Sequence, residues 1–228
     1  LGVVLVFHDV SEKRELANQL SHQARHDALT GLINRSEFER RLEGLIRSAM
    51  EEGKQHALLY LDLDQFKVVN DTCGHGAGDE LLRQLSARFC EKLRDSDTFA
   101  RLGGDEFGLL LENCSLDHAQ RVATLLLDEV RAFRFVWLDK TFAVGTSIGL
   151  VAITENSGNA ASVLSAADTA CYAAKDKGRD RVQIYSPEDS EMAKRHGEMH
   201  WLARITGAFE ENRFELYFQP IVGTQPGP

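Results

Sequence analysis

A pair of glycines between two short apolar runs places the strongest constraint on the fold of this chain. Gly103 and Gly104 follow the run Thr98–Leu102 and precede the run Phe107–Leu111. Both runs have the length and composition of short strands. Glycine adopts the positive φ angles that tight turns require, so the pattern predicts two antiparallel strands joined at the glycine pair.

Two adjacent acids, Asp105 and Glu106, follow the glycines directly. Their charges repel each other unless a cation or a solvated position relieves them. The glycines would also let a ligand approach the backbone closely. Two interpretations therefore stand side by side: an exposed acidic hairpin tip, and a site that binds a cation together with its ligand.

The rest of the chain alternates between helical and strand patterns. Ser36, followed by Glu39, has the pattern of a capping box at the start of a helix. Periodicity predicts helices over 36–50, 81–93, 116–133 and 160–177, strands over 56–63, 142–153 and 182–185, and a loop over 66–78. This alternation predicts an α+β domain of three layers, in which helices cover a central, mixed and largely antiparallel five-stranded sheet.

The composition argues against nucleic acids and membranes as binding partners. The 228-residue chain carries 26 Lys and Arg against 35 Asp and Glu, a formal net charge of −9. This balance argues against nucleic-acid binding, which requires clustered basic residues. The apolar runs are too short to span a bilayer and no signal-peptide pattern opens the chain, so we expect no membrane contact from this segment. Its four cysteines are widely spaced and form no Cys-x-x-Cys pair, so we expect reduced thiols and a cytoplasmic location. Anchoring of a longer parent protein at the inner membrane stays open.

Shifts in composition divide the chain into three segments. Residues 1–25 end in a polar helix over 11–25, whose few apolar residues indicate a connecting helix that pairs weakly with a second copy. Residues 26–186 form the main domain. Residues 187–228 begin at Pro187 with a charged stretch and lead through a short helix into another apolar strand.

A second acidic motif ends the first core strand. Asp62 and Asp64 alternate with leucines in the run Tyr60–Asp64, so the two acids share one face of the strand. If this strand lies beside the glycine hairpin, Asp62 and Asp105 can converge. Two carboxylates helped by a backbone carbonyl suit a Mg²⁺ ion that holds a triphosphate.

Basic residues that could balance the phosphate charge follow at three places. Lys67, Lys175 and Arg179 are the candidates, and the last two lie at a predicted helix end near Gly178. Taken alone, each is more typical of a solvated surface charge.

Polar side chains among small residues follow the first core strand. Asn70, His75 and Asp79 lie in a stretch with three glycines, which could form the lip of a pocket. Asp79 alone is better explained as a helix N-cap than as a contact to a nucleobase. An Asn and an Asp are nevertheless the pair needed to read guanine, because the carboxylate accepts from N1–H and the 2-amino group while the amide meets N3 or the amino group.

Five motifs occur in a fixed order along the chain: Asp27–Arg35, Asp62–Asp71, Gly74–Asp79, Arg101–Phe107 and Ala174–Arg179. Together they resemble the motif set of GGDEF-domain diguanylate cyclases. The resemblance covers about residues 22–186 and implies the fold of nucleotide cyclases and polymerase palm domains. Shorter stretches resemble neighbouring domains: residues 1–25 resemble the last strand and exit helix of a PAS sensor domain, and Leu216–Val222 resembles the opening strand of an EAL phosphodiesterase domain.

The resemblance implies an enzyme that condenses two GTP into cyclic di-GMP and releases two pyrophosphates. Asp62, Asp105 and the carbonyl of Leu63 would bind Mg²⁺, or Mn²⁺ in its place. Asp105 would also help deprotonate the ribose 3′-hydroxyl, while Glu106 supports the metal site. Lys67 would stabilise charge on the phosphates in the transition state.

The resemblance also assigns the residues that bind GTP. Asn70 and Asp79 would bind guanine, with His75 close by. Lys175 and Arg179 would hold the β- and γ-phosphates.

The symmetry of the product implies a second copy of the domain. Each domain would hold one GTP, so each 3′-hydroxyl must attack the α-phosphate held by the other copy. A two-fold homodimer, at least transiently, follows from this requirement.

A short motif before the hairpin implies feedback by the product. Arg94 and Asp97 match the inhibitory Arg-x-x-Asp site of the family, where the arginine can make bidentate contacts to a phosphate or a guanine edge. Cyclic di-GMP is therefore predicted to bind as an inhibitor as well as to leave as product. The alternative function is a domain that only binds GTP and thereby controls an adjacent cyclic di-GMP phosphodiesterase domain.

Overall fold

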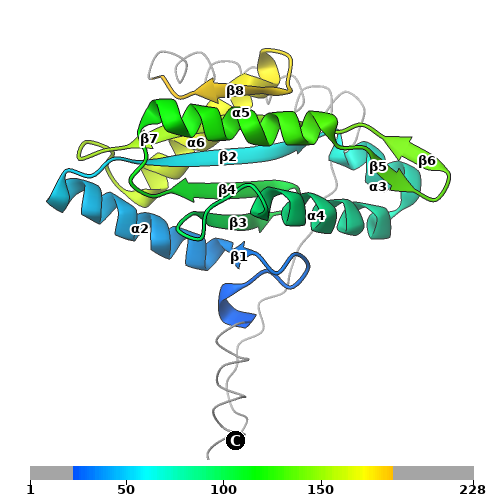
Figure 1. Ribbon diagram of the computed structural model, residues 1–228, viewed down its shortest axis with the longest axis horizontal. Helices are drawn as coiled ribbons and strands as arrows, with labels where there is room; N and C mark the ends of the chain where they lie inside the picture. Colours follow the sequence, from blue (N-terminus) through cyan, green and yellow to red (C-terminus); the bar gives the residue numbers. More distant parts are fainter. Residues whose placement is uncertain (1–22, 187–228) are drawn as a thin grey trace, which may run out of the picture.

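The computed structural model describes residues 23–186 of the chain. The predictions for the PAS-like segment, for most of the connecting helix and for residues 187–228 lie outside this range. Within it, one central sheet is covered by helices, with α4 and α5 in front of the sheet in the view of Figure 1.

Six strands form the central sheet in the order β1-β3-β4-β2-β7-β8. Their bounds are β1 (Ile33–Asn34), β2 (His56–Asp64), β3 (Thr98–Gly103), β4 (Glu106–Leu111), β7 (Gly145–Ile153) and β8 (Arg181–Ile184). β2 lies in the middle, antiparallel to both β4 and β7, whereas the outer pairs β1–β3 and β7–β8 are parallel. The mixed, largely antiparallel sheet is confirmed, but the predicted number of five strands is wrong. The additional strand, β1, has only two residues and is too short to show a period-two pattern.

Two hydrophobic clusters, one on each face of the sheet, create the three layers. Helices α2 (Arg35–Glu52) and α6 (Ala160–Asp176) pack on the face that carries Leu58 and Tyr60 of β2. Helices α3 (Phe66–Cys73), α4 (His75–Cys90) and α5 (Leu116–Ala132) pack on the face that carries Leu59 and Leu61. Because side chains alternate along a strand, Asp62 and Asp64 lie on the same face as Leu58 and Tyr60, toward α2 and α6.

A glycine in β7 lets α6 lie directly on the sheet. A Cβ atom at Gly149 would overlap the carbonyl oxygen of Ala167 and would lie 2.5 Å from the backbone nitrogen of Cys171. Both of these α6 residues are buried. This close packing brings the last turn of α6, which carries Lys175, to the exit of β2.

The glycine-rich stretch after β2 differs most from its prediction. The expected loop over 66–78 contains α3 and the first turn of α4, separated by Gly74 with a φ angle of 82°. Glycine is a poor helix former, so Gly76 and Gly78 signalled a loop, yet both lie inside α4. Packing against the sheet outweighs this local preference.

Two other predicted boundaries are also wrong. The N-cap of α2 is Asn34, whose side chain accepts from the backbone N–H of Glu37 at 3.0 Å, so Ser36 and Glu39 do not form a capping box. The predicted strand over 142–153 begins later, at Gly145. The preceding residues form a separate hairpin of β5 (Phe135–Trp137) and β6 (Lys140–Phe142).

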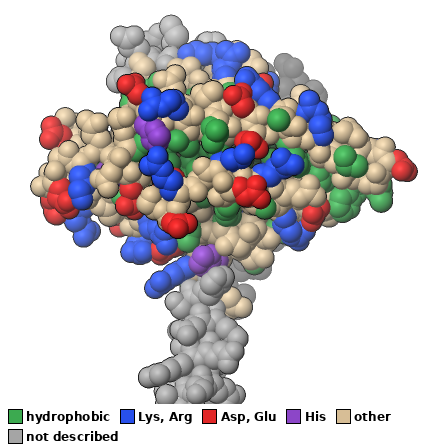
Figure 2. All heavy atoms as spheres, viewed as in Figure 1, with side chains coloured by type: hydrophobic (Ala, Val, Ile, Leu, Met, Phe, Trp, Pro, Cys, Tyr) green, Lys and Arg blue, Asp and Glu red, His purple; other side chains and the backbone are tan. Residues whose placement is uncertain are grey.

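The surface of the described part mixes both signs of charge. Basic and acidic side chains are interspersed on the face in Figure 2, and apolar side chains gather at the end where Figure 1 shows β5 and β6. Leu138, at the tip of that hairpin, is 86% exposed. None of the helices within residues 23–186 is long and apolar enough to cross a membrane.

Candidate active site

The exit of β2 meets the acidic turn between β3 and β4. Asp62 is paired with Glu106 across the β2–β4 ladder, and the backbone N–H of Leu63 donates to the carbonyl oxygen of Asp105 at 3.2 Å. Gly104 has a φ angle of 50°, as the predicted glycine turn requires. The hairpin and its adjacency to β2 are thus confirmed, and the turn brings three acids together.

A lysine from α6 partly neutralises this acidic cluster. Lys175 Nζ lies 2.5 Å from Asp62 Oδ2. Burial raises the pKa of the Asp62 carboxyl to about 6; Lys175 opposes this rise, and the charges of Asp105 and Glu106 add to it. Burial alone would lower the pKa of Lys175, but its hydrogen bond with Asp62 and the charge of that carboxylate raise it, so the lysine stays protonated.

An arginine braces the turn from the side of the first motif. The Arg101 guanidinium donates to the carbonyl oxygen of Gly104 through Nε at 3.0 Å and Nη2 at 2.9 Å. Its Nη1 atom donates to both carboxylate oxygens of Asp27, at 3.2 and 3.3 Å. Asp27 also accepts from the backbone N–H and the hydroxyl of Thr30. The sequence contains both residues within recognisable motifs, but no local signal connects them.

Replacing Arg101 by lysine is expected to lower the free energy of unfolding by about 1–2 kcal/mol, because an ammonium group cannot replace the planar fork that contacts Asp27 and Gly104 together. Chemical denaturation checks this value. Arg47→Lys, at an exposed position of α2, is the matched control and should change stability by less than about 0.5 kcal/mol. Equal stability of the two variants would contradict the bracing role of Arg101.

The residues predicted to read guanine lie at the junction of α3 and α4. Asn70 packs against Gly78, where a Cβ atom would overlap the amide Oδ1. That Oδ1 atom is buried and has no hydrogen-bond partner among the described residues. Asp79 follows Gly78, and His75 lies one turn earlier on the same helix. The preference for Asp79 as an N-cap is wrong, because α4 begins at His75 and its N-cap is Gly74.

The three basic candidates differ in how they relate to the acids. Lys175 contacts Asp62 directly. Arg179 Nε lies 3.9 Å from Asp64 Oδ1, at the same end of the sheet. Lys67 is exposed in the first turn of α3, directly after the exit of β2, and has no ion pair among the residues that the structure describes.

The predicted inhibitory site lies apart from these residues, next to α5. The backbone N–H of Arg94 donates to Asp97 Oδ2 at 3.0 Å. The guanidinium groups of Arg94 and Arg121 approach the two ring nitrogens of His118 at 3.3 and 3.2 Å. A neutral imidazole can accept a hydrogen bond at only one nitrogen, so His118 cannot accept from both arginines. One of the two guanidinium groups therefore lacks an acceptor on this ring. Arg94 and His118 border a cavity of about 180 Å³ that is also lined by Asp97. The sequence pattern did not identify His118 and Arg121.

The donor chemistry of the acidic cluster fits Mg²⁺. Within residues 23–186, no three Asp, Glu, His or Cys side chains lie close enough together to hold an ion by themselves. Mg²⁺ is usually bound through one or two carboxylates and completes its shell with water and substrate phosphates. The oxygens of Asp62 and Asp105 therefore suit an ion that arrives with a triphosphate.

The six-stranded sheet covered by helices, with the acidic turn and Lys175 at the exit of β2, is an α+β fold of the cyclase and polymerase-palm type. Within this class, residues 24–181 match the family described as "Diguanylate cyclase, GGDEF domain". The chain belongs to this family.

Three known proteins illustrate the match. The probable diguanylate cyclase DgcE of Escherichia coli is 47% identical over 190 residues, which cover 83% of this chain and 17% of DgcE. The cyclic di-GMP phosphodiesterase PdeB of Shewanella oneidensis is 39% identical over 226 residues, which cover 98% of this chain and 26% of PdeB. The crystal structure of the coiled coil and GGDEF domain of DgcB from Caulobacter crescentus, in complex with c-di-GMP, matches with a TM-score of 0.73 at 29% identity, covering 77% of this chain and 93% of that chain. The chain thus spans about a quarter or less of these two curated relatives.

Proposed function

We propose that this domain condenses two GTP molecules into cyclic di-GMP and releases two pyrophosphates. The observation that carries the proposal is the convergence of Asp62, Asp105 and Glu106 at one turn, with Lys175 on the central acid. Membership of the diguanylate cyclase family supplies the reaction class. A GTP substrate fits the cytoplasmic location expected from the sequence.

In the proposed reaction, the 3′-oxygen of one GTP forms a bond to the α-phosphorus of the other. The bond between this phosphorus and the bridging oxygen of pyrophosphate breaks, and the electron pair leaves with pyrophosphate. Asp105 accepts the proton of the 3′-hydroxyl. Lys67 stabilises negative charge on the phosphates in the transition state, and Lys175 and Arg179 hold the β- and γ-phosphates.

Mg²⁺, or Mn²⁺ in its place, would be held by Asp62, Asp105 and the carbonyl of Leu63, with Glu106 in support. The ion would supply charge stabilisation on the phosphates and would lower the pKa of the attacking hydroxyl. Lys175 pairs with Asp62 in the ligand-free protein, and a triphosphate beside this carboxylate would offer the lysine a second anionic partner.

Guanine binding is assigned to Asn70 and Asp79. The buried, unsatisfied Oδ1 of Asn70 supports this assignment, since a buried acceptor without a partner is costly unless a ligand satisfies it. Asp79 supplies the carboxylate that N1–H and the 2-amino group of guanine require. His75 lies one helical turn away, at the edge of the same face.

Gly78→Ala is expected to raise the KM for GTP about tenfold, equivalent to about 1.4 kcal/mol, and to change kcat by less than about threefold. The new methyl group would displace Asn70 and would lie 2.9 Å from a ring carbon of Phe66. Steady-state kinetics of pyrophosphate release measure both constants. Gly76→Ala is the matched control in the same helix, because a Cβ atom there meets nothing within 4 Å. Similar KM values for the two variants would refute the assignment.

The product requires two domains to face each other. Each domain offers one such site, so we infer a two-fold homodimer, at least transiently, in which each copy supplies one 3′-hydroxyl and one α-phosphate. The specific activity should therefore rise with protein concentration.

We also propose that cyclic di-GMP binds at Arg94 and Asp97 and inhibits the enzyme. The crowding of Arg94, His118 and Arg121 supports an anionic ligand, because a phosphate would supply the acceptors that these side chains lack. Arg94→Ala is expected to raise the product concentration for half-inhibition at least about tenfold, the scale of one lost charge-assisted contact. Rates measured with added cyclic di-GMP check this, and unchanged inhibition would refute the site.

One experiment tests the main proposal. The purified chain is incubated with GTP and Mg²⁺, and cyclic di-GMP and pyrophosphate are quantified in a ratio of one to two. Tight GTP binding without turnover, even at high protein concentration, would instead favour a regulatory module that controls an adjacent phosphodiesterase domain. The similarity of 98% of this chain to part of a phosphodiesterase, PdeB, is the observation that keeps this second function in view.

A further inference from the structure

Asp64, the last residue of β2, is a buried carboxylate for which the proposed reaction has no role. It is 6% exposed. Its Oδ1 accepts from the Ser147 hydroxyl at 2.9 Å, and its Oδ2 accepts from the backbone N–H of Asp180 at 3.1 Å. Both oxygens are thus engaged by the protein, in contrast to Asp62, whose only ion-pair partner among the described residues is Lys175.

The segment that Asp64 contacts has an unfavourable backbone conformation. Arg179 and Asp180 have φ angles of 61° and 48°, so two successive residues with side chains are left-handed. Such residues persist only where surrounding contacts impose them. Asp64 supplies one such contact through the N–H of Asp180, across 116 positions of sequence.

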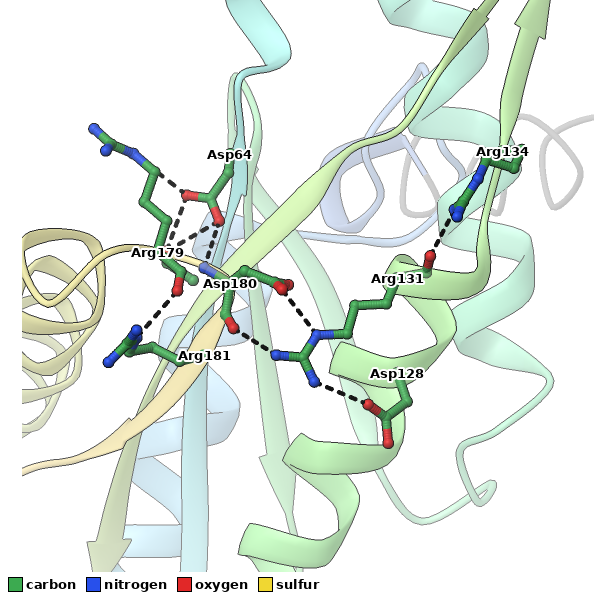
Figure 3. A network of polar contacts seen from close by, with 8 residues as sticks. Asp64, Asp128, Arg131, Arg134, Arg179, Asp180 and Arg181 are labelled. Carbon is green, nitrogen blue, oxygen red and sulfur yellow. Dashed lines mark hydrogen bonds and ion pairs between the residues drawn. The ribbon is translucent and has the colours of Figure 1, made fainter.

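Helix α5 holds the same turn from the other side. The Arg131 guanidinium donates through Nε to Asp180 Oδ2 and through Nη2 to the Asp180 carbonyl oxygen, both at 2.8 Å. Asp128 fixes the guanidinium from within α5 at 3.2 Å. Figure 3 shows Asp180 between Asp64 and Arg131, with Arg179 beside Asp64. The turn is therefore clamped between the exit of β2 and the end of α5.

The clamp leaves the side chain of Arg179 available. That side chain is 60% exposed, and its Nε atom stays 3.9 Å from Asp64 Oδ1. This separation is beyond hydrogen-bond range, so the two charges attract without a direct bond. The Arg179 guanidinium can therefore bind a second anion.

We propose that Asp64 is a positioning residue that fixes the left-handed turn at Arg179 and Asp180, and thereby sets the Arg179 guanidinium for a triphosphate. This rests on the proposed function, in which Arg179 contacts the terminal phosphates. Asp64 itself touches no reacting atom. Arg131 and Asp180 stabilise the same turn, so α5 also helps to position Arg179 for the phosphates.

A double-mutant cycle on the full chain tests the link to the nucleotide. Asp64→Asn is expected to raise the KM for GTP about five- to tenfold and to leave kcat within about threefold. Combined with Arg179→Ala, it should raise KM no further than Arg179→Ala does alone, because both changes remove one contact. If the two changes multiplied their effects on the KM for GTP in the double variant, the proposal would be overturned. Asp139→Asn, on the exposed β5–β6 hairpin, is the matched control and should behave as the parent chain.

Amide hydrogen exchange of Asp180 in the nucleotide-free chain tests the turn independently of catalysis. Exchange is expected to be at least about tenfold faster in Asp64→Asn and in Arg131→Gln. Arg131 has a half-exposed side chain, so Arg131→Gln should fold and keeps the test valid if Asp64→Asn does not fold. Unchanged exchange overturns the proposal even if the chain is a cyclase, whereas faster exchange supports the clamp even if the chain makes no cyclic di-GMP.

Discussion

Replacing Asp105 by asparagine is expected to lower kcat by about a thousandfold, the scale of a lost general base. Asparagine keeps the size of the side chain but cannot accept a proton at neutral pH, and it offers a weaker donor to Mg²⁺. The turn should survive the change, because Gly104 and the brace from Arg101 determine its backbone. Single-turnover formation of cyclic di-GMP at saturating GTP and Mg²⁺ measures the chemical step.

The control for this prediction changes the same chemical group elsewhere. Asp139→Asn removes an exposed carboxylate from the β5–β6 hairpin and should leave kcat within about twofold, as for most surface changes. GTP binding by Asp105→Asn, measured in the absence of turnover, should stay within about tenfold of the parent, because the residues proposed to bind guanine lie on α3 and α4. A kcat for Asp105→Asn within tenfold of the parent would remove Asp105 from the reaction.

Local sequence signals predicted the parts of the site that depend on single turns and strands. The hairpin at Gly104 could be predicted because a positive φ angle is a property of one residue and its neighbours. The common face of Asp62 and Asp64 follows from strand alternation alone. Whether these two acids approach Asp105 depends on which strands are adjacent, and strand alternation does not determine this. The structure places β4 beside β2.

Contacts between distant segments could not be predicted in the same way. Asp27 and Arg101 are 74 positions apart, and Asp64 and Asp180 are 116 positions apart. No periodicity relates such residues, because tertiary packing alone brings them together. The prediction for Asp79 failed for the opposite reason: nearby glycines gave a strong loop signal that helix packing overrode.

Replacing Asp62 by asparagine is expected to stabilise the metal-free protein while abolishing turnover. Burial raises the pKa of this carboxyl from 3.8 to about 6, so the folded protein binds its proton more tightly than the unfolded chain does. Between pH 4 and pH 6 the parent therefore loses stability as the pH rises, by about 3 kcal/mol in all, and the loss is complete above pH 6. Asparagine is uncharged at every pH and avoids this loss. The parent's carboxylate thus lowers stability in exchange for function.

Denaturant unfolding at two pH values, with and without Mg²⁺ and a GTP analogue, separates the two effects. At pH 7 without ligands, Asp62→Asn should be more stable than the parent by up to about 3 kcal/mol, and the difference should disappear near pH 4. Mg²⁺ with the analogue should stabilise the parent by mass action and stabilise the variant less, by about 1.4 kcal/mol for each tenfold loss of affinity. Glu112→Gln, at an exposed position just after β4, should show neither effect. If Asp62→Asn were less stable than the parent at pH 7, the attraction of Lys175 would outweigh burial, and Asp62 would be a structural ion-pair partner rather than a carboxylate held at a cost for the metal.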